Sequence, residues 1–194
     1  ANSPFFRSSG EPIESINQAV LVLGRQGIRN IISAVIMQPM MKGHGGPEKL
    51  FSQKVWKWAI LSATASDHYA QLRGEDSGPL YLLGILPSLS YLIIYRTLLG
   101  YQQNADAELA NIEPALIKAI IEKTSWQLCH DICEQWGLPD SCKGFLLSAE
   151  KRLNDLSTDA LHSAPLKDGL MMGQYLALDA LGQSPLEDDA VFNL

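Results

Sequence analysis

An all-α fold is what this sequence predicts, and three observations support it. Apolar residues recur at the three- and four-residue spacing of an amphipathic helix, capping residues stand before several of these stretches, and the alternating pattern of a strand is not found. We expect a compact bundle of eight or nine helices joined by short loops.

The first expected helix begins at Ser15, which forms a capping box with Gln18. Gly24 can end this helix because glycine readily adopts a left-handed conformation. A second helix follows directly, and Pro39 prevents it from continuing far. Its expected buried stripe comprises Ile28, Ile31, Ile32, Val35 and Ile36.

A Gly-rich segment from Lys42 to Gly46 is expected to be a flexible connector. It contains His44 but lacks the terminal Lys and Ser or Thr of a phosphate-binding P-loop. Pro47 opens a long helix that Gly74 ends. The expected buried side of this helix comprises Leu50, Phe51, Trp58, Leu61, Ala65, Tyr69 and Leu72.

Two strongly apolar helices are expected next, at residues 80–86 and 89–99, because Pro87 must end or kink the first. Their near-continuous apolarity predicts burial on most sides. A membrane span is disfavoured because polar residues and Pro87 interrupt the twenty apolar residues that a bilayer helix needs.

The second half of the chain predicts four more helices. One begins at Glu113 and Pro114, and another begins at Thr124, which forms a capping box with Gln127. The inward stripe of the latter is Cys129, Ile132, Cys133 and Trp136, and the run Gly137, Leu138 and Pro139 predicts a helix end and chain reversal. Asp140 is expected to cap a helix that carries Phe145, Leu146, Ala149 and Leu153.

The last expected helix lies beyond Pro165, carries Leu170, Tyr175, Ala177, Leu178 and Leu181, and ends at Gly182. The tail from Ser184, with Glu187, Asp188 and Asp189, is expected to be a solvated extension.

Composition favours a cytoplasmic protein. The 194 residues carry a formal net charge of -6, and the basic residues are scattered, which disfavours nucleic acids and anionic membranes as partners. The chain has three cysteines, Cys129, Cys133 and Cys142, and no secretory signal, so reduced thiols are expected.

Four segments resemble the HDOD domain family. The chain's opening resembles the signature aNSa…I.Si..Ai..LG through Ala1, Asn2, Ser3, Pro4, Phe5, Phe6, Ile13, Ser15, Ile16, Ala19, Val20, Leu23 and Gly24. VWKWA with Ala63, LGILPSLS from Leu83 to Ser90, and WGLP from Trp136 to Pro139 are similar to three later family blocks, in the family's order. The resemblance implies an HDOD-like domain at 1–156 that lacks its N-terminal helices, with a C-terminal helical extension at 157–194. Absence of those helices would leave apolar surface exposed.

The related HD phosphohydrolases hold divalent metal with a His, a His-Asp dipeptide and a later Asp. The resemblance aligns Trp58 with the first His. It aligns the pair Pro87 and Ser88 with the His-Asp dipeptide. These side chains are poor metal ligands. We therefore assign no catalytic, cofactor-binding or metal residues. The resemblance implies a non-catalytic bacterial signalling module that contacts another protein or domain, and a homo-oligomer remains open.

Two other functions are alternatives to this one. His130 and Asp131 form a literal His-Asp dipeptide outside the aligned block, so a metal-dependent phosphohydrolase with a relocated site is one alternative. A nucleotide-sensing pocket in which Trp58 stacks on a base is another, although no basic residues accompany it.

Two more features have a structural and a functional interpretation. Cys129, Cys133 and Cys142 with His130 could form a zinc site, but the usual knuckle spacing is missing and buried thiols are favoured. Trp56 and Trp58 lie two residues apart, so only one can face the core and the other could anchor a partner.

Overall fold

A computed structural model describes residues 15–43, 45–74, 77, 79–104, 112–153, 169–187 and 192. Within these residues the protein is all-helical and contains no strand, so the predicted fold class is confirmed. Six helices are present instead of eight or nine. They are α1 (Ile16–Met37), α2 (Gly46–Leu72), α3 (Leu80–Asn104), α4 (Pro114–Gln135), α5 (Asp140–Leu153) and α6 (Gly169–Leu181).

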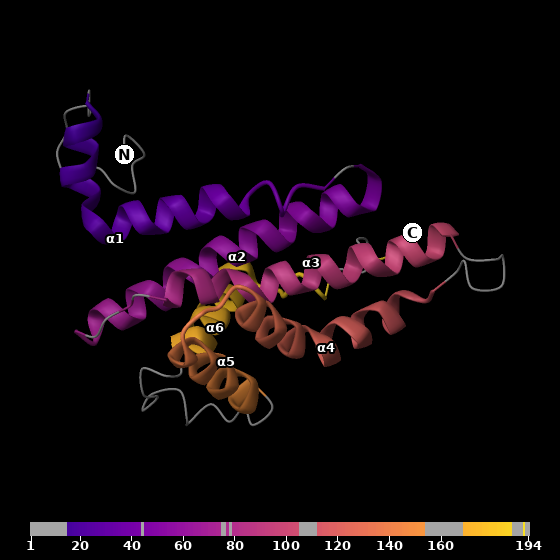
Figure 1. The fold of residues 1–194 in the computed structure, drawn as a ribbon. Helices are drawn as coiled ribbons and strands as arrows, with labels where there is room; N and C mark the ends of the chain where they lie inside the picture. Colours follow the sequence, from indigo (N-terminus) through magenta and orange to yellow (C-terminus); the bar gives the residue numbers. More distant parts are fainter. Residues whose placement is uncertain are drawn as a thin grey trace.

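Helices α2 and α3 form the centre of the bundle (Figure 1). They run antiparallel, since Gly84 of α3 lies against Ala63 of α2 and Arg96, further along α3, reaches Glu48 near the start of α2. Helix α4 packs beside α3, α6 packs on α2, and α5 contacts both α4 and α6. Both central helices are therefore covered by other helices.

Pro87 does not divide the apolar segment as we expected, because α3 continues from Leu80 through it to Asn104. A proline inside a helix removes one backbone hydrogen bond and costs about 3 kcal/mol. Burial on both sides of the proline offsets this cost, since Leu83, Ile85, Leu86, Leu89 and Leu92 are all at most 1% exposed.

The helix start expected at Thr124 is also wrong, because α4 runs uninterrupted from Pro114 to Gln135. The hydroxyl of Thr124 donates to the carbonyl oxygen of Ile120 at 2.7 Å, which is a bond within one helix and not a cap. The buried stripe passes through this point, from Ile121 to Ser125 and Cys129. These two continuous helices largely account for the lower helix count.

The predicted ends at Ser15 and Gly24 match the structure. The backbone N–H of Gln18 donates to Oγ of Ser15 at 3.1 Å, as in an N-cap. Gly24 has φ 62° and ψ -179°, so α1 consists of two helical segments that meet there at a kink. Figure 1 shows the first segment turned away from the body of the bundle.

The apolar stripe expected to be buried on α1 is largely exposed instead. Ile31, Ile32, Val35 and Ile36 face solvent. The helix contacts the body through its other side, where Gln26 and Asn30 donate to the carboxylate of Asp67 in α2 and Met37 is buried. A polar anchor therefore fixes which side of α1 faces inward.

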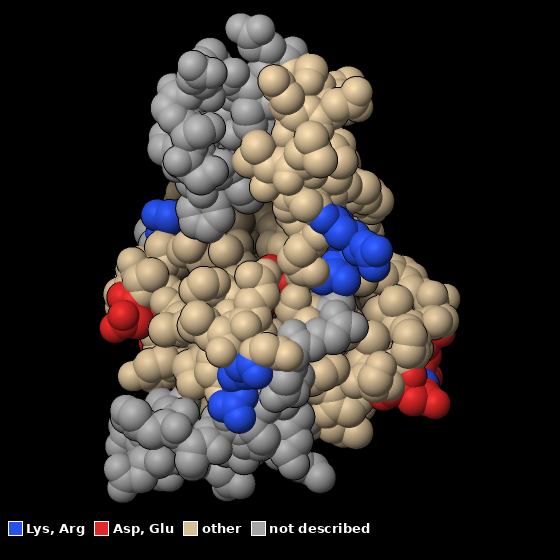
Figure 2. All heavy atoms as spheres, turned by 90° about the vertical axis from the view of Figure 1, so that its left-hand side faces the viewer, with Lys and Arg blue, Asp and Glu red and all other residues tan. Residues whose placement is uncertain are grey.

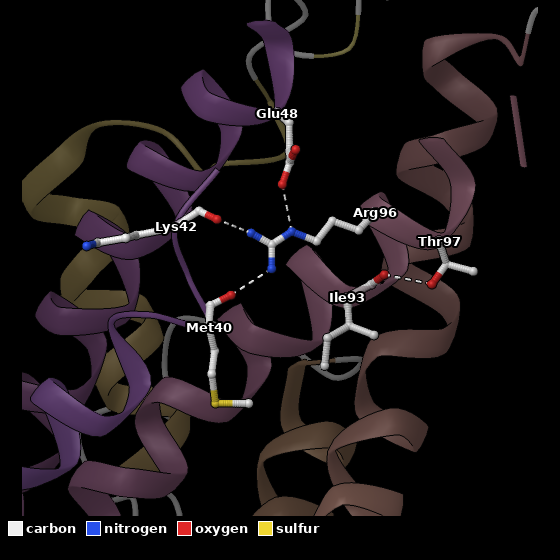
Figure 3. Close-up of polar contacts among 6 residues, drawn as sticks. All are labelled: Met40, Lys42, Glu48, Ile93, Arg96 and Thr97. Carbon is white, nitrogen blue, oxygen red and sulfur yellow. Dashed lines mark hydrogen bonds and ion pairs between the residues drawn. The ribbon is translucent and has the colours of Figure 1, made fainter. Parts of the chain in front are cut away.

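The Gly-rich connector is anchored to α3 by Arg96 (Figure 3). Nε of Arg96 donates to Glu48 at 2.7 Å, and its two terminal nitrogens donate to the carbonyl oxygens of Met40 and Lys42. A Cβ at Gly43 would lie 2.5 Å from Cα of Lys49, so only glycine fits there. Arg96 thus bonds the start of this segment to α3, the expected flexibility of the connector stays a prediction, and His44 lies outside the described residues.

The turn at Gly137 matches the prediction. Gly137 has φ 63°. The N–H of Leu138 donates to the carbonyl oxygen of Cys133 at 2.9 Å, and the N–H of Gly137 donates to the carbonyl oxygen of Glu134 at 3.0 Å. This pair of bonds defines a Schellman motif. Helix α5 then begins at Asp140 itself, so this residue lies in the first turn and does not precede it.

The chain's C-terminal segment differs from the solvated tail we expected. Leu186 and Phe192 are buried, and Phe192 is only 1% exposed. Its ring contacts those of Phe51 in α2 and Tyr95 in α3. Asp188 and Asp189 lie outside the described residues.

Two described helices are long and apolar enough to cross a bilayer by composition, namely Ile16–Met37 and Leu80–Gln102. The second has 56% of its most apolar window buried against other helices, whereas the first has 6% buried. Substantial burial of an apolar helix is typical of the core of a helical bundle, so packing accounts for the apolarity of α3.

Candidate functional site

Trp58 lies on the buried face of α2 and is 5% exposed. Its indole N–H donates to the side-chain oxygen of Gln174 in α6 at 2.6 Å. Trp56, two residues earlier, is only partly buried. Trp56 nevertheless packs against the hydrophobic core cluster, so the two indoles differ in how far they are buried, and the prediction that only one of them faces the core is not confirmed.

Pro87 and Ser88 lie in the middle of α3 and are both buried. Gly84 lies against Ala63, so one turn further along the antiparallel pair Ser88 lies near the level of Ala59. The hydroxyl of Ser88 has no hydrogen-bond partner among the described residues. All three positions are thus buried inside the bundle.

The chemistry of these three side chains does not fit a divalent metal. An indole nitrogen donates its hydrogen and offers no lone pair in the ring plane, and a proline side chain has no heteroatom. A single serine hydroxyl is a poor ligand by itself, because divalent ions need several converging nitrogen and oxygen donors. These three side chains therefore do not supply the donor set of a divalent-metal site.

Helix α6 closes this region through a close contact with α2. A Cβ added at Gly173 would lie 2.0 Å from Oγ of Ser66 and 2.4 Å from the carbonyl oxygen of Ser62. Only small residues on both helices permit such an approach. The hydroxyls of Ser62 and Ser66 and Nε2 of Gln174 are buried and have no hydrogen-bond partner among the described residues.

The buried face of α2 is therefore more polar than we predicted. Phe51 and Trp58 are buried as expected, but Leu50 and Leu72 are exposed. The residues that are buried on this helix are Phe51, Ser52, Val55, Trp58, Ala59, Ser62, Ala63, Ser66, Asp67 and Ala70. Trp136, expected on the inner side of its helix, is also exposed.

Asp67 is the most polar element of this face, and sequence reasoning missed it. Its carboxylate is 5% exposed and accepts from the amides of Gln26, Asn30 and Gln71, the last two at 2.9 and 2.8 Å. Gln26 also donates to the hydroxyl of Ser77 at 2.6 Å. The spacing of Asp67 and Gln71, one turn apart, was the one signal in the sequence. The cluster ties α1 to α2.

The literal His-Asp dipeptide does not form a cluster of metal ligands. Asp131 is exposed on α4 and accepts from Nε2 of Gln127 at 3.0 Å, one helical turn away. Throughout the described part of the chain, no group of three or more His, Cys, Asp or Glu side chains is placed to hold a metal ion.

The three cysteines are buried free thiols. The thiol of Cys129 lies 3.1 Å from the hydroxyl of Ser90. Burial raises the pKa of Cys133 to about 11, with a smaller contribution from neighbouring Cys142, and burial also raises the pKa of Cys142. Both thiols therefore stay protonated at neutral pH, whereas zinc binds thiolates.

Comparison with known families defines the class of this helical domain. The HDOD domain model matches residues 1–149, and the chain therefore belongs to the HDOD domain family. It is accordingly a degenerate relative of the HD phosphohydrolases, with α6 lying beyond the matched residues. No curated protein and no solved structure gives a significant match.

Proposed function

We infer that the chain is a non-catalytic regulatory module that acts in bacterial signalling by contacting another protein or domain. One observation carries the proposal. The positions that the resemblance aligns with the metal ligands of an HD enzyme carry Trp58, Pro87 and Ser88, and all three are buried. Neither the donor chemistry nor the packing favours metal-assisted hydrolysis.

Exposed apolar side chains support a role in protein contacts. Ile32, Val35 and Ile36 lie at helical spacing on one side of α1, and each is more than half exposed. Clustered apolar surface of this kind is typical of protein interaction sites.

The charge distribution gives no comparable support for nucleic acid. On the face shown in Figure 2, the described Lys and Arg side chains form small separate groups among uncharged residues. Binding to a phosphate backbone uses a continuous basic surface. We therefore propose a protein partner.

The nucleotide-sensing alternative finds little support in the packing. A base that stacked on Trp58 would need access to the indole ring, which is 5% exposed and bonded to Gln174. Helix α6 would have to move before a nucleotide could enter.

An activity assay tests the absence of catalysis. The purified chain is assayed against phosphodiester and phosphomonoester substrates with added Mn²⁺ or Mg²⁺, and we expect no turnover above that of the buffer. His130→Ala and its control His68→Ala, an exposed histidine on α2, should behave identically. Turnover that His130→Ala abolishes and His68→Ala preserves would establish the relocated phosphohydrolase instead.

A binding experiment tests the role in contacts. Retention of binding partners is measured on the intact protein as wild type and as two variants. The first variant combines Ile32→Asp with Val35→Asp. The second, Leu72→Asp, is the control, because Leu72 on α2 is also exposed. We expect the α1 variant to lose a partner that the wild type and Leu72→Asp retain. Equal retention by all three proteins would remove α1 from the proposal.

A further inference from the structure

Helix α1 is attached to the bundle by polar bonds along its middle and by a few apolar side chains at its end. Met37 is the one residue of α1 that is buried, and Ala34 packs partly against the core. The helices α2, α3, α4 and α6 pack extensively on one another, whereas the contact of α1 with α3 is much smaller. Separation of α1 from the bundle would therefore expose little apolar surface, and regions with few buried apolar contacts open locally at low free energy.

One carboxylate gathers the polar bonds of α1. Oδ2 of Asp67 in α2 accepts from Nδ2 of Asn30 in α1 at 2.9 Å, and Oδ1 accepts from Nε2 of Gln26 in α1. Nε2 of Gln71, which belongs to α2 itself, donates to the same Oδ2 atom at 2.8 Å. Among the described residues, the direct hydrogen-bond partners of the Asp67 carboxylate are thus uncharged amides, and two of them come from α1.

These bonds leave part of the contact between α1 and α2 unsatisfied. Nε of Arg29 and Oδ1 of Asn30 are buried and have no hydrogen-bond partner among the described residues. Asp67 is 5% exposed, and in the described part of the chain no cation bonds to its carboxylate directly. A buried polar group without a full set of partners carries a desolvation cost that water removes once the group is exposed. Opening of α1 would hydrate these groups, which offsets part of the cost of breaking its bonds to Asp67.

The opening segment of α1 has a defined boundary at each end. Gly24, with φ 62°, separates residues 25–37 from the first segment of the helix by a kink. Beyond the other end, the carbonyl oxygens of Met40 and Lys42 accept from Arg96 of α3, which fastens the chain to the bundle. A single helix of this length is marginally stable in water, so residues that leave the bundle also lose helical hydrogen bonds.

We propose that Asp67 latches α1 to the bundle, and that residues 25–37 open from it as a unit while α2, α3, α4 and α6 stay packed. Opening uncovers the side of α1 that carries Gln26, Asn30 and Met37, together with the carboxylate on α2. A partner that binds this uncovered surface would hold the open form, because a ligand shifts an equilibrium toward the state that it binds better. The opening is a property of this chain alone and does not depend on the proposed function.

Hydrogen exchange of the wild-type chain, followed by mass spectrometry, tests whether α1 opens separately. We expect the backbone amides of residues 26–37 to exchange at least about a hundredfold faster than those in the middle of α2 and α3. Equal protection of the three helices would overturn the proposal, because α1 would then open only when the whole bundle unfolds. This comparison needs no variant, so it does not depend on the folding of one.

Two matched variants test whether the carboxylate is the latch. Asn30 and Gln71 donate to the same oxygen atom of Asp67, but only Asn30 belongs to the segment that opens. Loss of one hydrogen bond to a charged group should make α1 in Asn30→Ala exchange about tenfold to a hundredfold faster than in wild type. Exchange of α2 and α3 in this variant should stay within about twofold of wild type, and Gln71→Ala should leave exchange of α1 within about twofold.

The pattern across the two variants decides between a latch and an ordinary packing contact. Alanine has a higher helix propensity than asparagine, so faster exchange of α1 in Asn30→Ala cannot come from a weaker helix. Faster exchange of α1, α2 and α3 together in Asn30→Ala would overturn the proposal, since the contact would then belong to the cooperative core. No effect of Asn30→Ala, or an equal effect of Gln71→Ala on α1, would also overturn it.

Discussion

The indole N–H of Trp58 donates to the side chain of Gln174 across 116 residues of sequence. The sequence resemblance aligns Trp58 with a metal-binding histidine of HD enzymes, and this alignment stays a prediction, whereas Gln174 belongs to a helix beyond the family match. The bond therefore connects α6 to the matched domain.

Replacing the indole of Trp58 tests whether its hydrogen bond to Gln174 stabilises the packing of α6. Trp58→Phe removes the donor and leaves the buried amide of Gln174 without its partner, which costs about 1–3 kcal/mol in addition to the lost packing. Trp136→Phe is the matched control, because Trp136 is 43% exposed and should change stability by less than about 0.5 kcal/mol. Urea denaturation gives both free energies, and equal losses would contradict the structural role of Trp58.

The close approach of α6 to α2 makes a second prediction. Gly173→Ala places a methyl group 2.4 Å from the backbone oxygen of Ser62, so α6 must shift at a cost of about 1–3 kcal/mol. Gly144→Ala in α5 meets nothing within 4 Å and should stabilise the helix by about 0.5–1 kcal/mol. Thermal unfolding of the two variants should therefore shift in opposite directions, and a stabilised Gly173→Ala chain would show that the helices are not in close contact.

The anchor of the Gly-rich segment makes a third prediction. Arg96→Met removes the ion pair with Glu48 and two bonds to backbone carbonyls, so we expect a loss of about 2–4 kcal/mol and faster proteolysis near Lys42. Lys143→Met removes an exposed ion pair with Glu134 and should leave the unfolding midpoint unchanged. If Arg96→Met were as stable as Lys143→Met, the segment would not depend on its anchor.

Alkaline pH should destabilise the fold. Burial raises the pKa of Cys133 to about 11 and that of Tyr95 to about 12, so the folded state keeps protons that the unfolded chain releases at lower pH. Stability is then constant up to about pH 8 and falls as pH rises from about 9 through 11. Urea midpoints measured from pH 7 to 11 test this, with Cys133→Ala expected to flatten part of the decline. A midpoint that rises in this window would contradict the burial of these groups.

The sequence predicted local features of the fold better than their tertiary setting. Ser15, Gly24 and Gly137 act through their own backbone and nearest neighbours, so caps and turns at these residues could be predicted. Pro87 and Thr124 were misinterpreted because the outcome depends on burial along the whole helix, which local propensity does not contain. The division of the chain near residue 156 and its cytoplasmic location remain predictions.

The candidate site was predictable in its chemistry and not in its surroundings. The sequence resemblance predicts that Trp58, Pro87 and Ser88 stand at the ligand positions, and this alignment stays a prediction. The hydroxyls of Ser62 and Ser66 could not be assigned to a buried face, because serine usually favours solvent. Phe192 was missed because the acidic residues before it predicted a solvated tail.

Metal binding at equilibrium tests the central claim most directly. The purified chain is dialysed against Mn²⁺ at tens of micromolar, and bound metal is measured by elemental analysis per mole of protein. We predict no stoichiometric binding, because the aligned positions offer an indole, a pyrrolidine ring and one hydroxyl. One tightly held ion per chain, lost on substitution of this chain's own side chains, would contradict the account.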